Sequence, residues 1–236
     1  MKQQEIIKAT FLERPNRFLA IVDINGERTE AFVPNPGRMY ELMIPGKEVF
    51  LRFNKGKHRK TDYDMIAVMH EGILISIDSY LPNRFLKRIL QNHELPVFKD
   101  YDTIKPEPAM YDGRFDFLLT GKKVTLIEVK SCTLVEEGRA IFPDAPTIRG
   151  ARHMGHLADA LRDGIVDEAY AVFVIQRPDA HIFSPNDPTD PDFGRILRES
   201  HSLGVQILPI ISELIDWDLR MKRIIPYDLE YFTKTV

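Results

Sequence analysis

The chain has 236 residues, 44% of them hydrophobic, and its 32 basic and 35 acidic side chains give a net charge of −3. This length supports a real core in one large domain or two small ones. The charge excludes a globally basic protein, so any surface for nucleic acid has to be local. The single cysteine, Cys132, excludes an internal disulfide and predicts a cytoplasmic protein. No apolar run approaches the roughly 18 residues of a membrane span, so we expect no membrane association.

Residues 1–78 are predicted to be rich in β-strands. Short alternating runs are separated by turns such as Asn25-Gly26, which favours a small barrel. The size matches an OB-type barrel, a common platform for single strands of nucleic acid, although that functional step is an analogy from fold. The predicted strands cover residues 6–12, 17–24, 30–33, 48–53, 64–70 and 73–77.

A helix is predicted next, over residues 79–94. Pro82 suits its first turn, and Pro96 lies just beyond its end. We place the domain boundary at the start of this helix. Residues 1–78 are then a nucleic-acid-binding barrel, and residues 79–236 are a second domain linked to it by the helix.

The second domain is predicted to alternate between strands and helices. The order strand, strand, helix, strand, helix, strand describes an α/β sandwich with a mixed sheet, in which an antiparallel hairpin precedes helical crossovers. The predicted segments are strands 114–119 and 124–130, loop 134–147, helix 148–162, strand 169–175, loop 177–192, helix 193–203, strand 205–211 and a mixed tail 212–236.

The segment RFDFLLTGKKVTLIEVK, residues 114–130, carries the main chemical signal. Side chains alternate along a strand, so Glu128 and Lys130 share one face of the second strand. A turn at residues 120–123 brings Asp116 within about one residue of the position opposite Glu128. Both faces of the second strand are largely apolar, so we expect it to be central and buried, where acids are costly unless paired or metal-bound.

Two close carboxylates repel each other, and a hard cation such as Mg²⁺ or Mn²⁺ relieves that repulsion. Lys130 would then steady an attacking water or the charge that develops on a phosphate. Asp116, Glu128 and Lys130 are therefore the candidate catalytic residues of a metal-dependent nuclease. The alternative is an Asp/Glu–Lys ion pair that only holds the sheet together, which a bare match to this pattern favours.

Basic residues at the start of helix 148–162 are candidates for contact with phosphate. Arg149 and Arg152 share a helix face, His153 lies beside them, and Thr147 is the expected N-cap. The alternative is an ordinary solvated amphipathic helix.

The predicted barrel carries a second basic group in the loop NKGKHRK, and a further loop presents Arg38. These residues are candidates for backbone contact with DNA, and the alternative is a solvated hairpin tip and a simple turn. The candidates in this part of the chain are Arg38, Arg52, Lys55, Lys57, Arg59 and Lys60.

Several longer segments make the chain similar to a known family. They extend over most of residues 34–193 and include PNPGRM, RFDFLL, IEVKSCTLVEEGRAIFPDAPTIRGARHMGHL and FSPNDPTDPDF. On these residues the chain resembles the sugar fermentation stimulation protein family of bacteria and archaea. The resemblance implies an N-terminal OB-like β-barrel followed by a PD-(D/E)xK nuclease-like α/β sandwich with a mixed sheet.

The resemblance also implies roles for individual residues. Asp116 fills the metal-binding Asp position of the nuclease pattern, Glu128 and Lys130 fill the E-x-K, and Glu107 matches an upstream acid that is a further metal ligand. The implied metal set is thus Glu107, Asp116 and Glu128.

Two functions remain as alternatives at this stage. The preferred one is a DNA-binding protein of low sequence specificity with a regulatory role in sugar (maltose) metabolism, which the resemblance implies. The other is a Mg²⁺-dependent nuclease or phosphodiesterase. The oligomeric state stays open, with a homodimer as one alternative.

Overall fold

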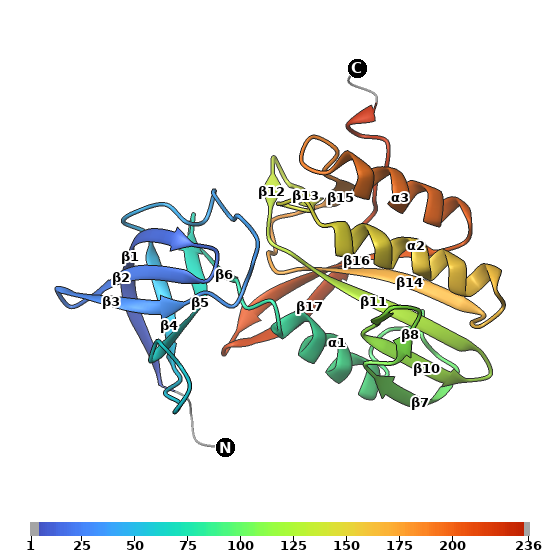
Figure 1. Ribbon diagram of the computed structural model, residues 1–236, viewed down its shortest axis with the longest axis horizontal. Helices are drawn as coiled ribbons and strands as arrows, with labels where there is room; N and C mark the ends of the chain where they lie inside the picture. The colour runs from blue at the N-terminus through green and yellow to red at the C-terminus, as the bar shows by residue number, and fades with distance from the viewer. Residues whose placement is uncertain (1–4, 234–236) are drawn as a thin grey trace.

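The computed structural model describes residues 5–233, which form a β-barrel and a larger α/β part joined by a helix (Figure 1). The barrel strands pair in the order β3-β2-β1-β4-β5-β6. A parallel pairing of β3 with β5, through Ala31 and Tyr63, closes the barrel, so the expected OB-like architecture is confirmed. The strands are β1 (Ile6–Asn16), β2 (Leu19–Ile24), β3 (Glu27–Phe32), β4 (Glu48–Phe53), β5 (Tyr63–His70) and β6 (Ile73–Ser76).

Local sequence explains the β2–β3 hairpin of the barrel. Ile24 pairs with Glu27, so Asn25 and Gly26 form a two-residue turn. Both have positive φ, 55° and 91°, a geometry that Asn-Gly adopts readily and that matches the twist of the strands.

The larger part is built on a sheet with the strand order β17-β16-β14-β11-β10-β7. β10 and β11 are antiparallel, whereas β11, β14 and β16 are parallel, so the expected mixed sheet is confirmed. The elements are α1 (Leu81–Gln91), β7 (Tyr101–Pro106), β8 (Ala109–Met110), β9 (Gly113–Arg114), β10 (Phe117–Gly121), β11 (Val124–Cys132), β12 (Val135–Glu136), β13 (Arg139–Phe142), α2 (Ile148–Arg162), β14 (Glu168–Ile175), β15 (Ile182–Pro185), α3 (Pro191–Ser202), β16 (Gln206–Ile215) and β17 (Asp218–Ile224).

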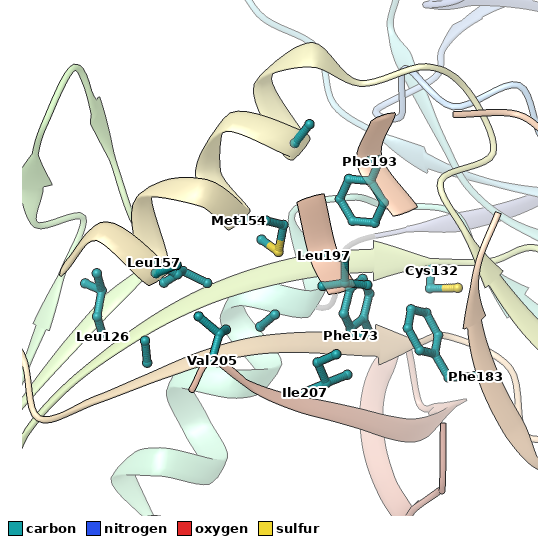
Figure 2. Close-up of a cluster of buried hydrophobic side chains, with 14 of the residues drawn as sticks. Leu126, Cys132, Met154, Leu157, Phe173, Phe183, Phe193, Leu197, Val205 and Ile207 are labelled. Atoms are coloured by element: carbon teal, nitrogen blue, oxygen red, sulfur yellow. The ribbon is translucent and has the colours of Figure 1, made fainter. Parts of the chain in front are cut away.

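Helices cover both faces of this sheet, with α2 and α3 on one side and α1 on the other (Figure 1). On the α2/α3 side, Met154 and Leu157 of α2 and Leu197 of α3 pack on Leu126 and Phe173 of the strands (Figure 2). Ile127 and Val129 of β11 face the α1 side. β11 is therefore buried on both faces, as its apolar pattern predicts.

Some strands were not predicted from the sequence. Segment 134–147, expected to be a loop, contains β12 and β13, which have two and four residues. β13 pairs with β15 from the second expected loop, and a strand whose partner is distant in sequence has a weak local signal. β17 lies in the tail that was expected to be mixed, and β7 was also missed. Both are edge strands with many exposed side chains, so they lack a strong apolar pattern.

The barrel and the α/β part pack against each other. The ring of Phe50 on β4 lies 5.3 Å from that of Trp217, between centroids. The carboxylate of Asp144 accepts a hydrogen bond from Met39 N–H at 3.1 Å. The expected boundary between residues 78 and 79 lies between β6 and α1 and stays a prediction. Within residues 5–233, no helix is long and apolar enough to cross a membrane.

Candidate functional site

The β10–β11 hairpin brings the two acids of the sequence motif together. Phe117 pairs with Ile127, so the preceding residue, Asp116, lies directly across from Glu128. β11 is flanked by β10 and β14 in the middle of the sheet. The hairpin turn expected at residues 120–123 therefore predicted that these two acids lie across from each other.

Glu128 is 4% exposed and has one satisfied carboxylate oxygen. Its Oε1 accepts hydrogen bonds from Lys130 Nζ at 2.6 Å and from His153 Nδ1 at 2.7 Å. Within residues 5–233, its Oε2 is buried and has no hydrogen-bond partner. Burial acts to raise the pKa of Glu128, but Lys130 and His153 outweigh it and lower that pKa. The carboxylate is thus ionised and leaves one oxygen unsatisfied.

Asp116 is held between β11 and α1. Its Oδ2 accepts from Val129 N–H at 2.6 Å, and its Oδ1 accepts from the side-chain amide of Asn83. Burial, and next the negative charge of Glu128, raise the pKa of Asp116 to about 6. At neutral pH the pair therefore carries charge that the protein only partly compensates.

This pair suits a divalent cation. A buried, unpartnered carboxylate oxygen is costly, and a hard cation with oxygen ligands removes that cost. In the described part of the chain, however, no three His, Cys, Asp or Glu side chains already converge as a metal-binding group. Glu107, the third expected ligand, donates its backbone N–H to the Asp116 carbonyl, while its exposed carboxylate pairs with Arg114 at 3.3 Å. Glu107 is thus adjacent to the pair but engaged elsewhere.

The N-terminus of α2 lies beside the acidic pair. Thr147 Oγ1 accepts from Gly150 N–H at 3.0 Å, which is the expected N-cap. Arg149 and Arg152 are exposed on the first turns, whereas His153 is 3% exposed and points at Glu128. His153 was expected to contact DNA, but its burial indicates that it orients Glu128.

An open cavity of about 620 Å³ lies in front of this helix end. Arg149 Nε contacts His153 Nε2 at 3.4 Å, and Arg152 pairs with Asp112 at 3.0 Å. The side chains that line the cavity include Arg114, Arg149, Arg152 and His153. Asp112 also lines it. His153 therefore lies between an arginine-rich rim and the acidic pair.

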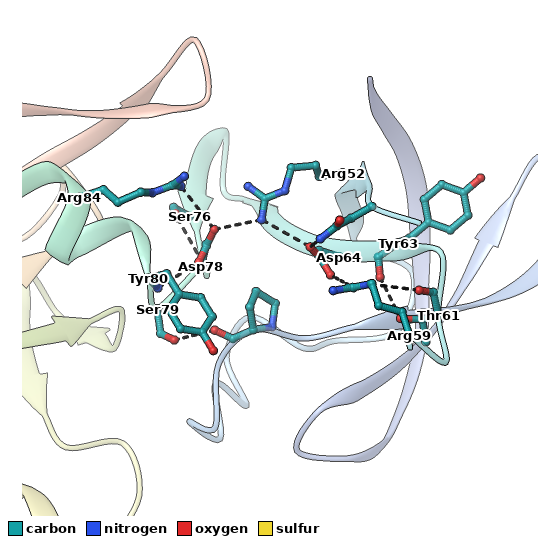
Figure 3. Close-up of polar contacts among 12 residues, drawn as sticks. Arg52, Arg59, Thr61, Tyr63, Asp64, Ser76, Asp78, Ser79, Tyr80 and Arg84 are labelled. Atoms are coloured by element: carbon teal, nitrogen blue, oxygen red, sulfur yellow. Dashed lines mark hydrogen bonds and ion pairs between the residues drawn. The ribbon is translucent and has the colours of Figure 1, made fainter. Parts of the chain in front are cut away.

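Two of the basic candidates of the barrel, Arg52 and Arg59, form ion pairs with buried carboxylates (Figure 3). Arg52 lies between Asp64 and Asp78, at 3.5 and 3.3 Å, and its side chain is 18% exposed. Arg59 also pairs with Asp64. The guanidinium of Arg52 is thus used inside the protein, which its sequence context did not indicate. Exposed candidates also remain, and they are Arg38, Lys55, Lys57 and Lys60.

Comparison with known proteins gives this architecture a family. A sequence profile described as "SfsA N-terminal OB domain" matches residues 12–77. A second profile, "Sugar fermentation stimulation protein RE domain", matches residues 80–216. The chain belongs to the sugar fermentation stimulation protein (SfsA) family.

Relatives and a solved structure agree with this membership. A sugar fermentation stimulation protein homolog from Desulfitobacterium hafniense is 43% identical over 217 residues, covering 92% of this chain and 93% of the relative. A homolog from Moorella thermoacetica is 45% identical over 205 residues, covering 86% and 88%. The structure of Pyrococcus furiosus SfsA in complex with Ca²⁺ is 29% identical, with a TM-score of 0.87 over 97% of this chain and 98% of that one.

Sequence reasoning missed two residues of this SfsA-family site. Asn83 reaches Asp116 from α1, and Asp112 reaches both Arg152 and His156, at 3.0 and 3.6 Å. These contacts depend on how α1 and the β8–β9 hairpin pack beside the motif strands. The one sequence signal was the amide of Asn83 in the first turn of the predicted helix. Such a residue is too common in helices to indicate a site.

Proposed function

We propose that this SfsA-family protein binds DNA through its phosphate backbone with little sequence preference. The observation that carries the proposal is the arginine-lined cavity beside the Asp116–Glu128 pair. Arg149 and Arg152 project toward solvent from a helix N-terminus. Guanidinium groups suit phosphate oxygens geometrically, and such contacts carry no base information.

Exposed cations on the barrel support the same proposal. Lys57 and Lys60 lie in the β4–β5 loop, and Arg38 lies in the loop that precedes β4. With a net charge of −3, the protein would depend on these local groups for attraction to DNA. The family name motivates the finer proposal that DNA binding regulates sugar (maltose) metabolism in the cytoplasm. Altered transcript levels of sugar-utilisation genes in a deletion strain would test that part.

The salt dependence of binding tests the DNA proposal. Affinity for two unrelated duplexes is measured over a range of salt concentrations for the wild type and for the Arg149→Ala/Arg152→Ala variant. Loss of two phosphate contacts should weaken both complexes equally and reduce the slope of log K against log salt by roughly 2. Arg162→Ala is the matched control, since Arg162 is an exposed arginine at the other end of α2 that pairs with Asp159. An unchanged slope in the double variant contradicts the proposal.

A second candidate function, a Mg²⁺- or Mn²⁺-dependent nuclease, is favoured by the unpartnered Oε2 of Glu128. Asp116 and Glu128 would hold the metal, with Glu107 as the further ligand. The bound ion would supply positive charge for the phosphate. His153 and Lys130 both donate to Oε1 of Glu128, so they leave its Oε2 for a ligand. Pyrococcus furiosus SfsA was solved in complex with Ca²⁺, which supports a divalent-cation site here.

Within this candidate nuclease, Lys130 is the group that would act on the reaction. Its ammonium lies 2.6 Å from Glu128 Oε1, beside the acidic pair. From there it would orient a water molecule or stabilise charge on a phosphate oxygen.

A cleavage assay separates the two candidates. Single-stranded, duplex and branched DNA are incubated with Mg²⁺ or Mn²⁺ and with the wild type or Lys130→Ala. Cleavage that disappears in Lys130→Ala, while the variant still shows a thermal shift with Ca²⁺, supports the nuclease. Intact DNA together with a salt-sensitive mobility shift supports a protein that only binds.

A further inference from the structure

Two phenylalanine rings with nearly parallel planes lie at the barrel surface, outside the site described above; Phe18 is exposed and Phe32 is half-buried. Phe18 connects β1 with β2, and Phe32 ends β3; their ring centroids are 6.2 Å apart and their planes differ by 12°. Phe18 is 49% exposed, although its backbone is fixed on both sides. Its N–H donates to Asn16 Oδ1 at 2.9 Å, and its carbonyl accepts from Val33 N–H at 2.9 Å. The rings therefore form an apolar platform at the surface, and the backbone of Phe18 is held in place beneath it.

A guanidinium group is held over this platform by the closure of the barrel. The β3–β5 pairing puts Phe32 opposite Asp64, and Arg59 pairs with Asp64 (Figure 3). As a result Arg59 Cζ lies 5.7 Å from the centroid of the Phe32 ring. This position fits a cation–π contact.

Phe18 and Phe32 line a groove of about 470 Å³ together with charged side chains. Arg59 and Lys60 are its basic lining residues, and Lys57 and His58 of the same loop are also exposed. Glu30 is the acidic side chain among the residues that line the groove. The groove thus offers flat apolar faces, a cluster of cations and one carboxylate acceptor.

We propose that this groove binds an unpaired base of single-stranded DNA, stacked on Phe18 and Phe32, with Lys60 and Arg59 beside the flanking phosphates. A nucleotide combines a flat π-face with an adjacent negative charge. Its base matches the phenylalanine rings of the groove, and its phosphate matches the basic side chains. Duplex DNA hides its base faces, and an apolar peptide would bring no negative charge to Lys60. Glu30 would repel phosphate, so the backbone would lie on the Lys60 side while base N–H donors face Glu30. This inference rests on the proposed DNA binding and adds a preference for unpaired segments.

Fluorescence titration tests the platform. The probe is an oligothymidylate of about 12 nucleotides, within the site size of OB folds, with one 2-aminopurine whose emission falls on stacking. Phe18→Ala and Phe32→Ala should each weaken binding of this probe about tenfold. They should also abolish the quenching and leave the affinity for a duplex of the same length unchanged. Phe18→Trp and Phe32→Tyr should retain binding, because an aromatic face remains.

The control variant is Leu203→Ala, which removes an exposed apolar side chain at the end of α3 and should bind like the wild type. Circular dichroism checks that each variant is folded. If the Phe18→Ala/Phe32→Ala variant binds the probe within about twofold of the wild type and still quenches it, the platform is overturned while DNA binding stands. A wild type that binds no DNA of either form overturns both proposals. Binding of oligouridylate about tenfold tighter than oligothymidylate overturns the assignment to DNA.

Discussion

At the scale of single residues, Asp116 is a carboxylate whose ionisation the fold opposes. Its pKa is raised from an ordinary 3.8 to about 6 by burial and by Glu128. A raised pKa means that the bound proton stabilises the native state. This contribution is complete below the unfolded pKa and is lost as pH rises through about 6. The pKa difference corresponds to a cost of about 3 kcal/mol for ionised Asp116.

We therefore expect Asp116→Asn to become more stable, relative to the wild type, as the pH rises from about 4 to about 8, by up to about 3 kcal/mol. Urea unfolding in metal-free buffer measures the difference at each pH. A relative stability that falls over this interval would instead indicate that the Asp/Glu–Lys group is an ion pair that holds the sheet together.

A bound divalent cation should offset the cost of keeping Asp116 ionised beside Glu128. Ca²⁺ or Mn²⁺ at 100 times its dissociation constant should stabilise the wild type by about 2.7 kcal/mol. Glu128→Gln and Asp116→Asn should lose most of this gain, because each removes a charged oxygen ligand. Thermal shifts with and without EDTA measure the effect, and an equal shift in the variants would place the ion elsewhere.

The sequence predicted the acidic pair because the hairpin turn at residues 120–123 is a local signal that sets how its two strands pair. It did not predict that His153 is buried against Glu128 or that Arg52 is enclosed by Asp64 and Asp78. Both outcomes depend on tertiary packing, since the same residue types are solvated at most other positions in proteins. The basic surface was therefore predicted less well than the acidic pair.

At the scale of elements, one carboxylate supports two helix N-termini. Asp190 accepts from Phe193 N–H at 3.0 Å as the cap of α3, and from Thr147 N–H at 2.7 Å at the start of α2. Thr147 in turn caps α2 through Gly150 N–H. The position of the Arg149–Arg152 turn thus depends on α3 as well as on its own cap.

Asp190→Ala should accordingly lower the free energy of unfolding more than Thr147→Ala does. A lost cap costs about 1 kcal/mol, and Asp190→Ala removes a cap and also leaves Thr147 N–H unpaired, for about 2–3 kcal/mol in total. Urea denaturation of both variants measures the order. Thr147→Ser is the control, because its hydroxyl keeps the cap, and equal losses for Asp190→Ala and Thr147→Ala would refute the shared role.

The boundaries of α2 were predicted from the sequence because Thr147 and the apolar periodicity are local signals. β12, β13 and β15 were not, since each is short and the pairing that joins β13 to β15 is distant in sequence, for example Arg139 with Ile182. Sequence pattern alone therefore described the central sheet better than the small sheet beside it.

At the scale of the whole molecule, a tight contact joins the barrel to the second domain. A Cβ added to Gly37 would lie 2.5 Å from Asp144 Oδ2, and that carboxylate is fixed by Met39 N–H. Burial raises the pKa of Asp144, which reflects how closely the barrel loop covers it.

Gly37→Ala should thus push the barrel loop away from Asp144 of the second domain. Overpacking should lower the free energy of unfolding by about 1–3 kcal/mol. Calorimetry should show a broader transition and a lower midpoint. Gly155→Ala is the matched control, because its added Cβ would meet only Ile196 at 4.0 Å. A Gly37→Ala protein that melts like the wild type would show that the barrel loop can shift to make room for the methyl group with no loss of stability.

The contact between Phe50 and Trp217 has a practical consequence. The chain contains one tryptophan, and that indole lies where the barrel packs on the second domain. Its emission is therefore an intrinsic optical reporter of whether the two halves are docked. Stopped-flow recording of this signal during DNA addition would follow any opening of the molecule in real time without a dye.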